Sequence, residues 1–375
     1  MFLVSCKKEA AQNDIEGLKE NVRETYAQIA FAIYKDSLIE AKKLQKEIEL
    51  FLKEPSKAGL DKCRQAWLAS REPYGLSEAF RFSNGPIDNE GLEGAINAWP
   101  LDESYIDYVR GNEQSGIINN SKDYPKINKG TVLKLNEQGA ETNISTGFHA
   151  VEFLLWGQDQ EDTSLKTPGD RSFKDFTDAP NAERRAAYLK ITIDLLVEHL
   201  ETICKEWDPQ IKGNYLERYK GINHDKSLRD IFNGLFNFSK AELAGERMFV
   251  AIRNKDQEDE HSCFSDNTHR DIIQNFNGIR NLALGEYTRL NGEKVSGPGL
   301  IDLVEKADQE KAAQMRKQIA ELSELMKGIP IPFDHALTTE VLGKGKLSVI
   351  VNKLMALGDS FAQSIKILKL QQDAI

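Results

Sequence analysis

A histidine and a glutamate three positions apart, His149 and Glu152, stand in an otherwise apolar run over residues 145–156. If this run is helical, both side chains project from the same face of the helix. An imidazole and a carboxylate that project together can hold a transition metal or exchange a proton. Burying both without partners would be unfavourable, so a side chain, a water, a metal or a ligand must satisfy them. The sequence therefore predicts a polar site on this helix.

A stable metal site usually needs more than two protein ligands, so further groups must converge on this pair. Imidazole nitrogen together with carboxylate oxygen suits iron, zinc, copper or manganese better than magnesium or calcium. Side chains of the right type occur in other polar blocks: Glu78, Asp88, Glu90, Asp102, Glu103, His261 and Asp266. We expect most of these acidic groups to be solvated surface charges. Asp102 and Glu103 are equally suited to cap a helix.

Two arginines, Arg81 and Arg247, stand in polar blocks in the two halves of the chain. A guanidinium can hold a carboxylate through two parallel hydrogen bonds. We therefore expect Arg81 to organise acidic groups of the site rather than to form a surface ion pair of little energetic weight. A nucleophilic Cys263 with a histidine partner, His261 or His269, is a weaker hypothesis. That segment reads as a polar loop whose groups satisfy the backbone donors of the next helix.

The sequence Gly-Phe-His-Ala-Val-Glu over residues 147–152 resembles the Gly-x-His-x-x-Glu signature of the imelysin family. These are bacterial cell-envelope proteins linked to iron uptake and classed by some as peptidases. Other stretches resemble further blocks of that family in the expected order: residues 80–88, 96–103, 243–248 and 259–269. The resemblance implies a role in iron acquisition, with other iron-uptake envelope proteins as partners. It also implies that the blocks of Arg81 and Arg247 meet near an interface between two bundles.

Peptide hydrolysis is an alternative function. No second histidine lies within a turn of His149, so the His-Glu-x-x-His pattern of zinc peptidases and its inverse are absent. A cell-surface metallopeptidase would need metal ligands from elsewhere and an independent base. A second alternative is a binding module for a polymer or a partner protein, without any metal.

The net charge of −10 argues against non-specific nucleic-acid binding and mildly favours cationic ligands. The first residues, Met-Phe-Leu-Val-Ser-Cys, resemble the end of a bacterial lipoprotein signal with Cys6 as the lipidated residue. This predicts a cell-envelope protein, periplasmic or surface-exposed, whose membrane contact is only the lipid anchor. We expect it to bind a metal ion, iron or zinc, or a metal-bearing ligand.

Helical periodicity dominates the chain, and strand signals are scarce. The pattern predicts four long helices in each half: 13–51, 61–80, the His149 helix, 181–207, 228–253, 269–287, 300–327 and 335–370. The expected fold is all-α, with two domains resembling four-helix bundles over 13–210 and 211–375, after a lipoprotein-like tail over 1–12. A short repeated pattern after Gly147 and Gly245 hints that the halves arose by duplication. We expect the His149 helix to face the cleft between them.

Overall fold

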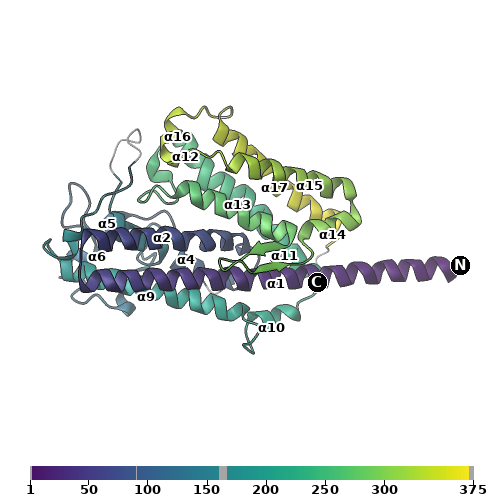
Figure 1. Cartoon of the computed structure of the whole chain (residues 1–375), viewed down its shortest axis with the longest axis horizontal. Coiled ribbons are helices and arrows are strands. Elements are labelled where there is room, and N and C mark those ends of the chain that lie inside the picture. The colour runs from purple at the N-terminus through teal and green to yellow at the C-terminus, as the bar shows by residue number, and fades with distance from the viewer. Residues whose placement is uncertain (1, 90, 160–166, 371–375) are drawn as a thin grey trace.

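The structure is a computed structural model that describes residues 2–89, 91–159 and 167–370, with side chains described from residue 14 onward. Glu90 and the side chain of Cys6 lie outside the described part, so the expectations for them stay predictions. Within this part the fold is helical apart from one two-stranded hairpin, which confirms the all-α class (Figure 1).

The first half of the chain places three long helices side by side. They are α1 (Phe2–Lys53), α2 (Lys57–Ser77) and α9 (Ala182–Trp207). α1 begins inside the segment that the sequence assigned to a tail. The Gly- and Asn-rich stretch between α2 and α8 (Gly147–Trp156) carries short helices: η1 (Glu78–Phe80), α3 (Pro86–Asn89), α4 (Leu92–Ile96), α5 (Glu103–Ile106), α6 (Gly116–Asn119) and α7 (Lys129–Leu135). The short η2 (Phe173–Phe176) precedes α9.

The second half begins with α10 (Tyr215–Lys220) and a long rod that runs without a break through α11 (His224–Asn237), the π-helix η3 (Phe238–Phe249) and α12 (Val250–Asn254). After η4 (Gln257–Asp259) come α13 (Thr268–Leu284), the strands β1 (Glu286–Thr288) and β2 (Lys294–Ser296), and the helices α14 (Leu300–Ala307), α15 (Gln309–Met326), α16 (Phe333–Thr339) and α17 (Lys346–Ile367).

Several helix boundaries differ from the sequence-based expectation for local reasons. The predicted helix over 300–327 breaks at Asp308, whose side chain accepts the backbone N–H of Lys311 and starts α15. The predicted helix over 335–370 divides into α16 and α17. α13 ends at Gly285, which has a φ of +72°, and a hairpin follows where the helix was expected to reach Tyr287.

The two halves meet along α2 and α13, which pack against each other (Figure 1). α8 contacts both α2 and α9. α1 contacts α2 and α9 in the first half and also α11, α14 and β2 in the second. The division into two domains near residue 210 stays a prediction. None of the helices, as far as they are described, is long and apolar enough to span a membrane.

Candidate functional site

The helix that carries His149 and Glu152 is buried along its whole length, because every residue of α8 is shielded from solvent. It starts at Gly147, which has a φ of +85°. A Cβ atom at this position would come within 2.5 Å of the backbone oxygen of Ile96 in α4. Only glycine combines this backbone conformation with so close an approach. The glycine of the motif therefore lets α8 dock on α4 and sets the position of the histidine two residues later.

His149 and Glu152 contact each other directly, as their spacing predicted. Nδ1 of His149 lies 2.9 Å from Oε2 of Glu152. The other carboxylate oxygen accepts hydrogen bonds from the backbone N–H and the hydroxyl of Ser265, at 3.1 and 2.7 Å. Burial raises the pKa of Glu152 to about 8 and holds the pKa of His149 well below its usual value. Both shifts favour the uncharged forms of the pair.

A second imidazole, that of His261, stands against the first. The ring centroids of His149 and His261 are 4.7 Å apart, with the planes at 76°. Nδ1 of His261 lies 2.8 Å from Oδ2 of Asp271, at the start of α13. Each histidine thus has its Nδ1 engaged by a carboxylate, and Nε2 of each is buried without a hydrogen-bond partner. Buried polar atoms of this kind are rare and call for an explanation.

Asp271 also fixes the position of Arg71, which reaches it from α2. Nε of Arg71 donates to Oδ1 of Asp271 at 3.2 Å, and the hydroxyl of Ser262 donates to Oδ2 at 2.5 Å. Nη1 of Arg71 donates to Oδ1 of Asn97 at 2.5 Å. Burial, together with the charges of Arg247 and Arg71, lowers the pKa of His261 to about 4. His261 is therefore neutral at pH 7, which is the form in which imidazole binds a metal.

A second ionic network lies beside this pair and joins the two halves. Nη2 of Arg247 donates to Glu78 of η1 at 2.5 Å and to Glu242 of η3 at 2.8 Å, and Nη1 of Arg81 donates to Glu242 at 3.0 Å. Although burial opposes it, Arg247 and Arg81 hold the pKa of Glu242 at about 2. Glu242 and Arg247 are five positions apart, the repeat of the π-helix that carries both. The predicted meeting of the Arg81 and Arg247 blocks is present, with Arg81 gathering carboxylates.

A cavity of about 290 Å³ opens next to these groups. It is lined from both halves by Arg81, Glu93, Asn97, Ala98, Trp99, Pro100, Glu137, Glu141, Glu242, Glu246, Arg247 and His261. Carboxylates outnumber guanidinium groups in this lining, so the cavity favours cations. Burial raises the pKa of Glu93 to about 7.

The remaining predicted residues lie elsewhere. Asp88 accepts the backbone N–H groups of Phe82 and Ser83 and shapes their loop. Asp102 caps α5, which is the alternative role the sequence had suggested. Asp266 stands one residue from Ser265 but belongs to a separate acidic cluster. Burial raises the pKa of Cys263 well above its usual value, so a thiolate nucleophile is not favoured there.

Sequence reasoning missed the residues that hold the site together. Asp271 of α13 and Ser265 of the preceding loop bond to His261 and Glu152, and Arg71 of α2 bonds to Asp271. Arg71 gave no signal, because a lone arginine in an amphipathic helix normally faces solvent. Asp271 lies two positions after His269. From the sequence it looked only like an acidic residue in the first turn of a helix.

Comparison with known proteins shows that the chain is similar to iron-regulated and imelysin-like proteins. The Imelysin family model matches residues 30–360. Iron-regulated protein A of Synechococcus elongatus is 22% identical over 338 residues, which cover 87% of this chain and 79% of that protein.

Two crystal structures share the fold. One, described as an iron-regulated protein A precursor from Parabacteroides distasonis, superposes with a TM-score of 0.69 at 19% identity, over 94% of this chain and 95% of that one. The other, an imelysin-like protein from Psychrobacter arcticum, gives a TM-score of 0.59 at 14% identity, over 93% and 94%. With a family match over most of its length and the Gly147–Glu152 motif at the junction of its halves, the chain belongs to the imelysin family.

Proposed function

We propose that the chain binds a transition-metal ion or a metal-bearing ligand at His149 and His261, between the two halves of the molecule, as part of iron acquisition at the cell envelope. The observation that carries this proposal is the pair of buried Nε2 atoms, each without a hydrogen-bond partner, on rings 4.7 Å apart.

The hydrogen bonds around the two rings are those of metal-binding histidines. Such histidines usually engage a carboxylate or carbonyl through one ring nitrogen, which orients the ring and leaves the other nitrogen for the metal. Glu152 and Asp271 make this contact with His149 and His261. Because both oxygens of Glu152 have partners within the protein, we assign Glu152 a positioning role rather than a place among the direct ligands.

Two imidazole nitrogens suit iron or zinc, and further ligands must come from the bound molecule or from the acidic cavity beside His261. The name of the Synechococcus relative, iron-regulated protein A, supports a connection with iron, and the resemblance to envelope proteins supports the compartment. A lipid anchor at Cys6 completes the proposal. Mass spectrometry of protein from the native host tests the anchor, and an unmodified Cys6 would remove it.

Metal binding is tested by calorimetric titration of Zn²⁺, and of Fe²⁺ without oxygen, into the wild type, His149→Ala and His261→Ala. We expect each substitution to weaken the tightest binding at least tenfold. His224→Ala is the matched control, because His224 is a partly exposed histidine at the start of α11. Equal affinity in all four proteins would contradict the proposal, and circular dichroism establishes that each variant is folded.

The metallopeptidase alternative predicts cleavage of a denatured protein substrate that a chelator abolishes. Glu152 has no free oxygen to act as a base. Of the carboxylates that line the cavity, Glu93 has a pKa near neutrality. Cleavage that is lost in Glu93→Gln while metal affinity is kept would favour the enzyme. A module without a metal predicts no binding in any of these titrations.

A further inference from the structure

Three aspartates from distant parts of the chain meet on the side of the loop opposite the histidine pair. Asp159 follows α8, Asp266 precedes α13, and Asp334 lies in the first turn of α16. One carboxylate oxygen of each lies within 4.8 Å of the others. Among the described residues, no other group of three histidine, cysteine or acidic side chains comes this close together.

Two buried carboxylate oxygens at this place have no hydrogen-bond partner. Asp334 is only 4% exposed and its Oδ1 is unpartnered, as is Oε1 of Glu260, which is 1% exposed. A buried carboxylate without a partner for its charge is strongly disfavoured. Asp334 and Glu260 therefore supply acceptor atoms that the surrounding protein does not use.

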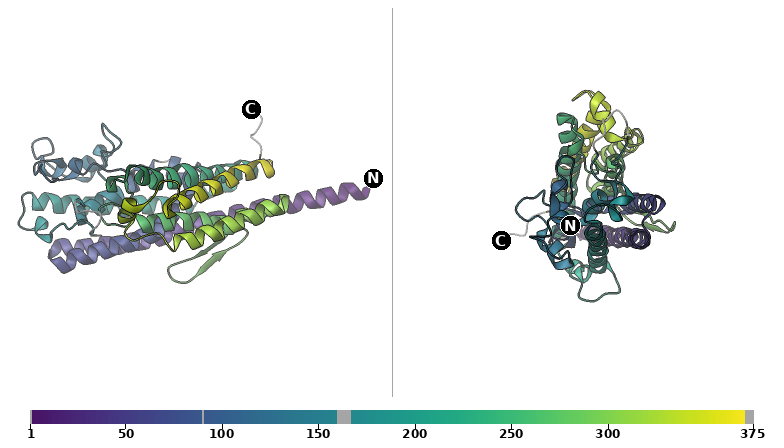
Figure 2. Two further views of the ribbon diagram at one scale, coloured as in Figure 1. Left: turned by 90° about the horizontal axis from the view of Figure 1, so that it is seen from above. Right: turned by 90° about the vertical axis from the view of Figure 1, so that its left-hand side faces the viewer.

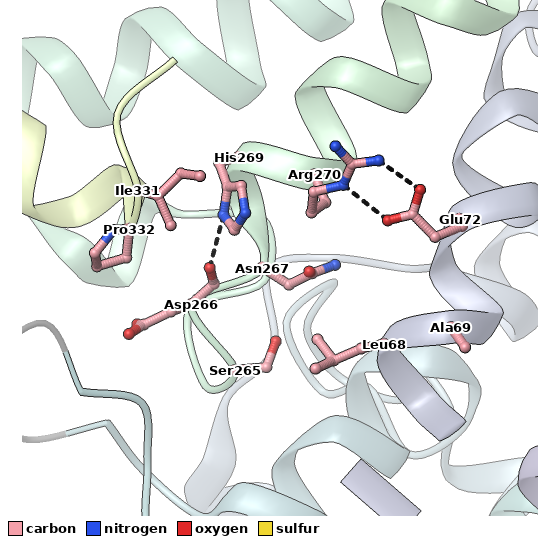
Figure 3. A pocket seen from close by; sticks show the side chains of 10 residues that line it. All are labelled: Leu68, Ala69, Glu72, Ser265, Asp266, Asn267, His269, Arg270, Ile331 and Pro332. Atoms are coloured by element: carbon pink, nitrogen blue, oxygen red, sulfur yellow. Dashed lines mark hydrogen bonds and ion pairs between the residues drawn. The ribbon is translucent and has the colours of Figure 1, made fainter. Parts of the chain in front are cut away.

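Like charges and burial act together on this cluster. Burial and the carboxylates of Asp334 and Asp159 raise the pKa of Asp266 to about 7. Burial and Asp334 hold the pKa of Glu260 well above its usual value. Burial also raises the pKa of Asp334, and the neighbouring His335 offsets part of that rise. Arg270 is committed to Glu72 across the adjoining cavity (Figure 3).

We propose that Asp159, Asp266 and Asp334 form a site for a hard divalent cation, Ca²⁺ above all, distinct from the histidine site. Calcium takes six to eight oxygen ligands and tolerates irregular geometry, whereas magnesium demands a near-ideal octahedron. Three carboxylates from three separate segments of the chain suit the irregular geometry of calcium better than the octahedron of magnesium. A set made only of oxygens is also the wrong one for zinc or copper.

A route for the ion exists on the outer side of the cluster. Figure 3 shows the cavity of about 490 Å³ whose wall includes Asp266, His269 and Pro332. In that view the carboxylate of Asp266 points away from Arg270, toward the segment that carries Pro332 and leads into α16. Asp334 lies two positions after Pro332. The cavity therefore reaches the cluster at Asp266.

Thermal unfolding of the full chain is measured in EDTA and in millimolar Ca²⁺. Calorimetric titration measures its Ca²⁺ affinity. We expect Ca²⁺ to raise the melting temperature of the wild type. In Asp334→Asn the Ca²⁺ affinity should fall at least tenfold. Because the amide relieves repulsion, Asp334→Asn should melt above the wild type in EDTA and below it in Ca²⁺. This reversal of order cannot come from a damaged fold.

Two controls make the result specific. Glu72→Gln alters an acidic group on the wall of the same cavity but outside the cluster, and it should keep Ca²⁺ affinity. His149→Ala should also keep it, which separates this site from the proposed transition-metal site. No Ca²⁺ binding by the wild type, or equal Ca²⁺ affinity in the wild type and Asp334→Asn, would overturn the proposal.

Discussion

Arg71 and Asp271 form a buried ion pair, each side chain only 1% exposed. Asp271 in turn accepts from His261 and Ser262, so one carboxylate holds an arginine of the first half and a histidine of the second. Burial opposes ionisation of Asp271, but Arg71 and His261 hold its pKa well below the usual range. At the residue scale, the site depends on buried charges, each of which would be unfavourable without its oppositely charged partner.

Arg71→Met should therefore be strongly destabilising, by about 3–5 kcal/mol, because it leaves the buried carboxylate of Asp271 without its cation. Arg270→Met breaks an exposed arginine–carboxylate pair with Glu72, at 36% and 33% side-chain exposure, and should cost about 1 kcal/mol or less. Urea unfolding of both variants measures the difference. An equal loss in the free energy of unfolding in the two variants would show that Arg71 does not stabilise the buried carboxylate of Asp271.

Glu93 on the cavity wall should make stability depend on pH. Its folded pKa of about 7 lies above the ordinary value of 4.5, because burial outweighs the charge of Arg81. The folded state thus keeps a proton that the unfolded chain releases. The stability contributed by this group is complete below pH 4.5 and is lost as the pH rises through about 7.

Glu93→Gln should remove this loss. The free energy of unfolding of the variant, relative to that of the wild type, should therefore increase as the pH rises from 5 to 8. The gain is on the order of 2 kcal/mol, since one pKa unit corresponds to about 1.4 kcal/mol. Urea unfolding at both pH values measures it. A parallel pH profile in the two proteins would contradict the assignment.

At the scale of elements, α8 is positioned by contacts that other elements make with its backbone. Gly147 at its start approaches Ile96 of α4 too closely for a Cβ atom, and Trp67 of α2 donates from Nε1 to the backbone oxygen of Phe148 at 3.0 Å. A helix held in this way presents His149 in one orientation. The π-helix η3 has a similar effect on Arg247, because it brings Glu242 alongside.

Gly147→Ala should destabilise the protein by about 1–3 kcal/mol through the positive φ alone, and by more if α4 must move. Gly17→Ala is the control, since Gly17 lies in α1 with nothing near its missing Cβ. It should be neutral or slightly stabilising, as alanine is the better helix former. Thermal unfolding of both variants gives the comparison, and a neutral Gly147→Ala would refute the close-approach argument.

The helical class and most long helices were predictable, because amphipathic periodicity is a local property of the sequence. The contact of His149 with Glu152 was predictable for the same reason. The partnership with His261 was not, since it joins segments more than a hundred positions apart through the docking of α8 against the loop before α13. The cluster of Asp159 and Asp334 was not predicted for the same reason. Each looks in the sequence like an acidic residue of a loop, and the two meet only in the folded structure.

At the scale of the whole molecule, α1 and α2 connect the two halves. α1 packs on helices of both halves (purple in Figure 2), and α2 packs along α13 (Figure 1). The buried network of Arg247, Glu78, Arg71 and Asp271 crosses the same boundary. The halves therefore share a core although their helices are separate in sequence.

Unfolding should accordingly be one cooperative transition. All four tryptophans belong to the first half, and Trp99 and Trp207 also contact residues of the second half, so their fluorescence follows mainly the first half and its boundary, whereas far-ultraviolet circular dichroism follows helices in both. Because the halves share α1 and the buried network, the two signals should give the same urea midpoint. Separate midpoints would mean that the halves unfold independently.

Ser265 and Asp266 are neighbours in the chain, and they face different candidate sites. Ser265 holds Glu152, which orients His149, and Asp266 belongs to the aspartate cluster. An ion bound at either site would restrict the backbone of Ser265 and Asp266, and the other site depends on the position of the same backbone. Under both proposals, thermodynamic reciprocity requires that any factor by which calcium changes the affinity for the transition metal equals the factor by which the transition metal changes the affinity for calcium.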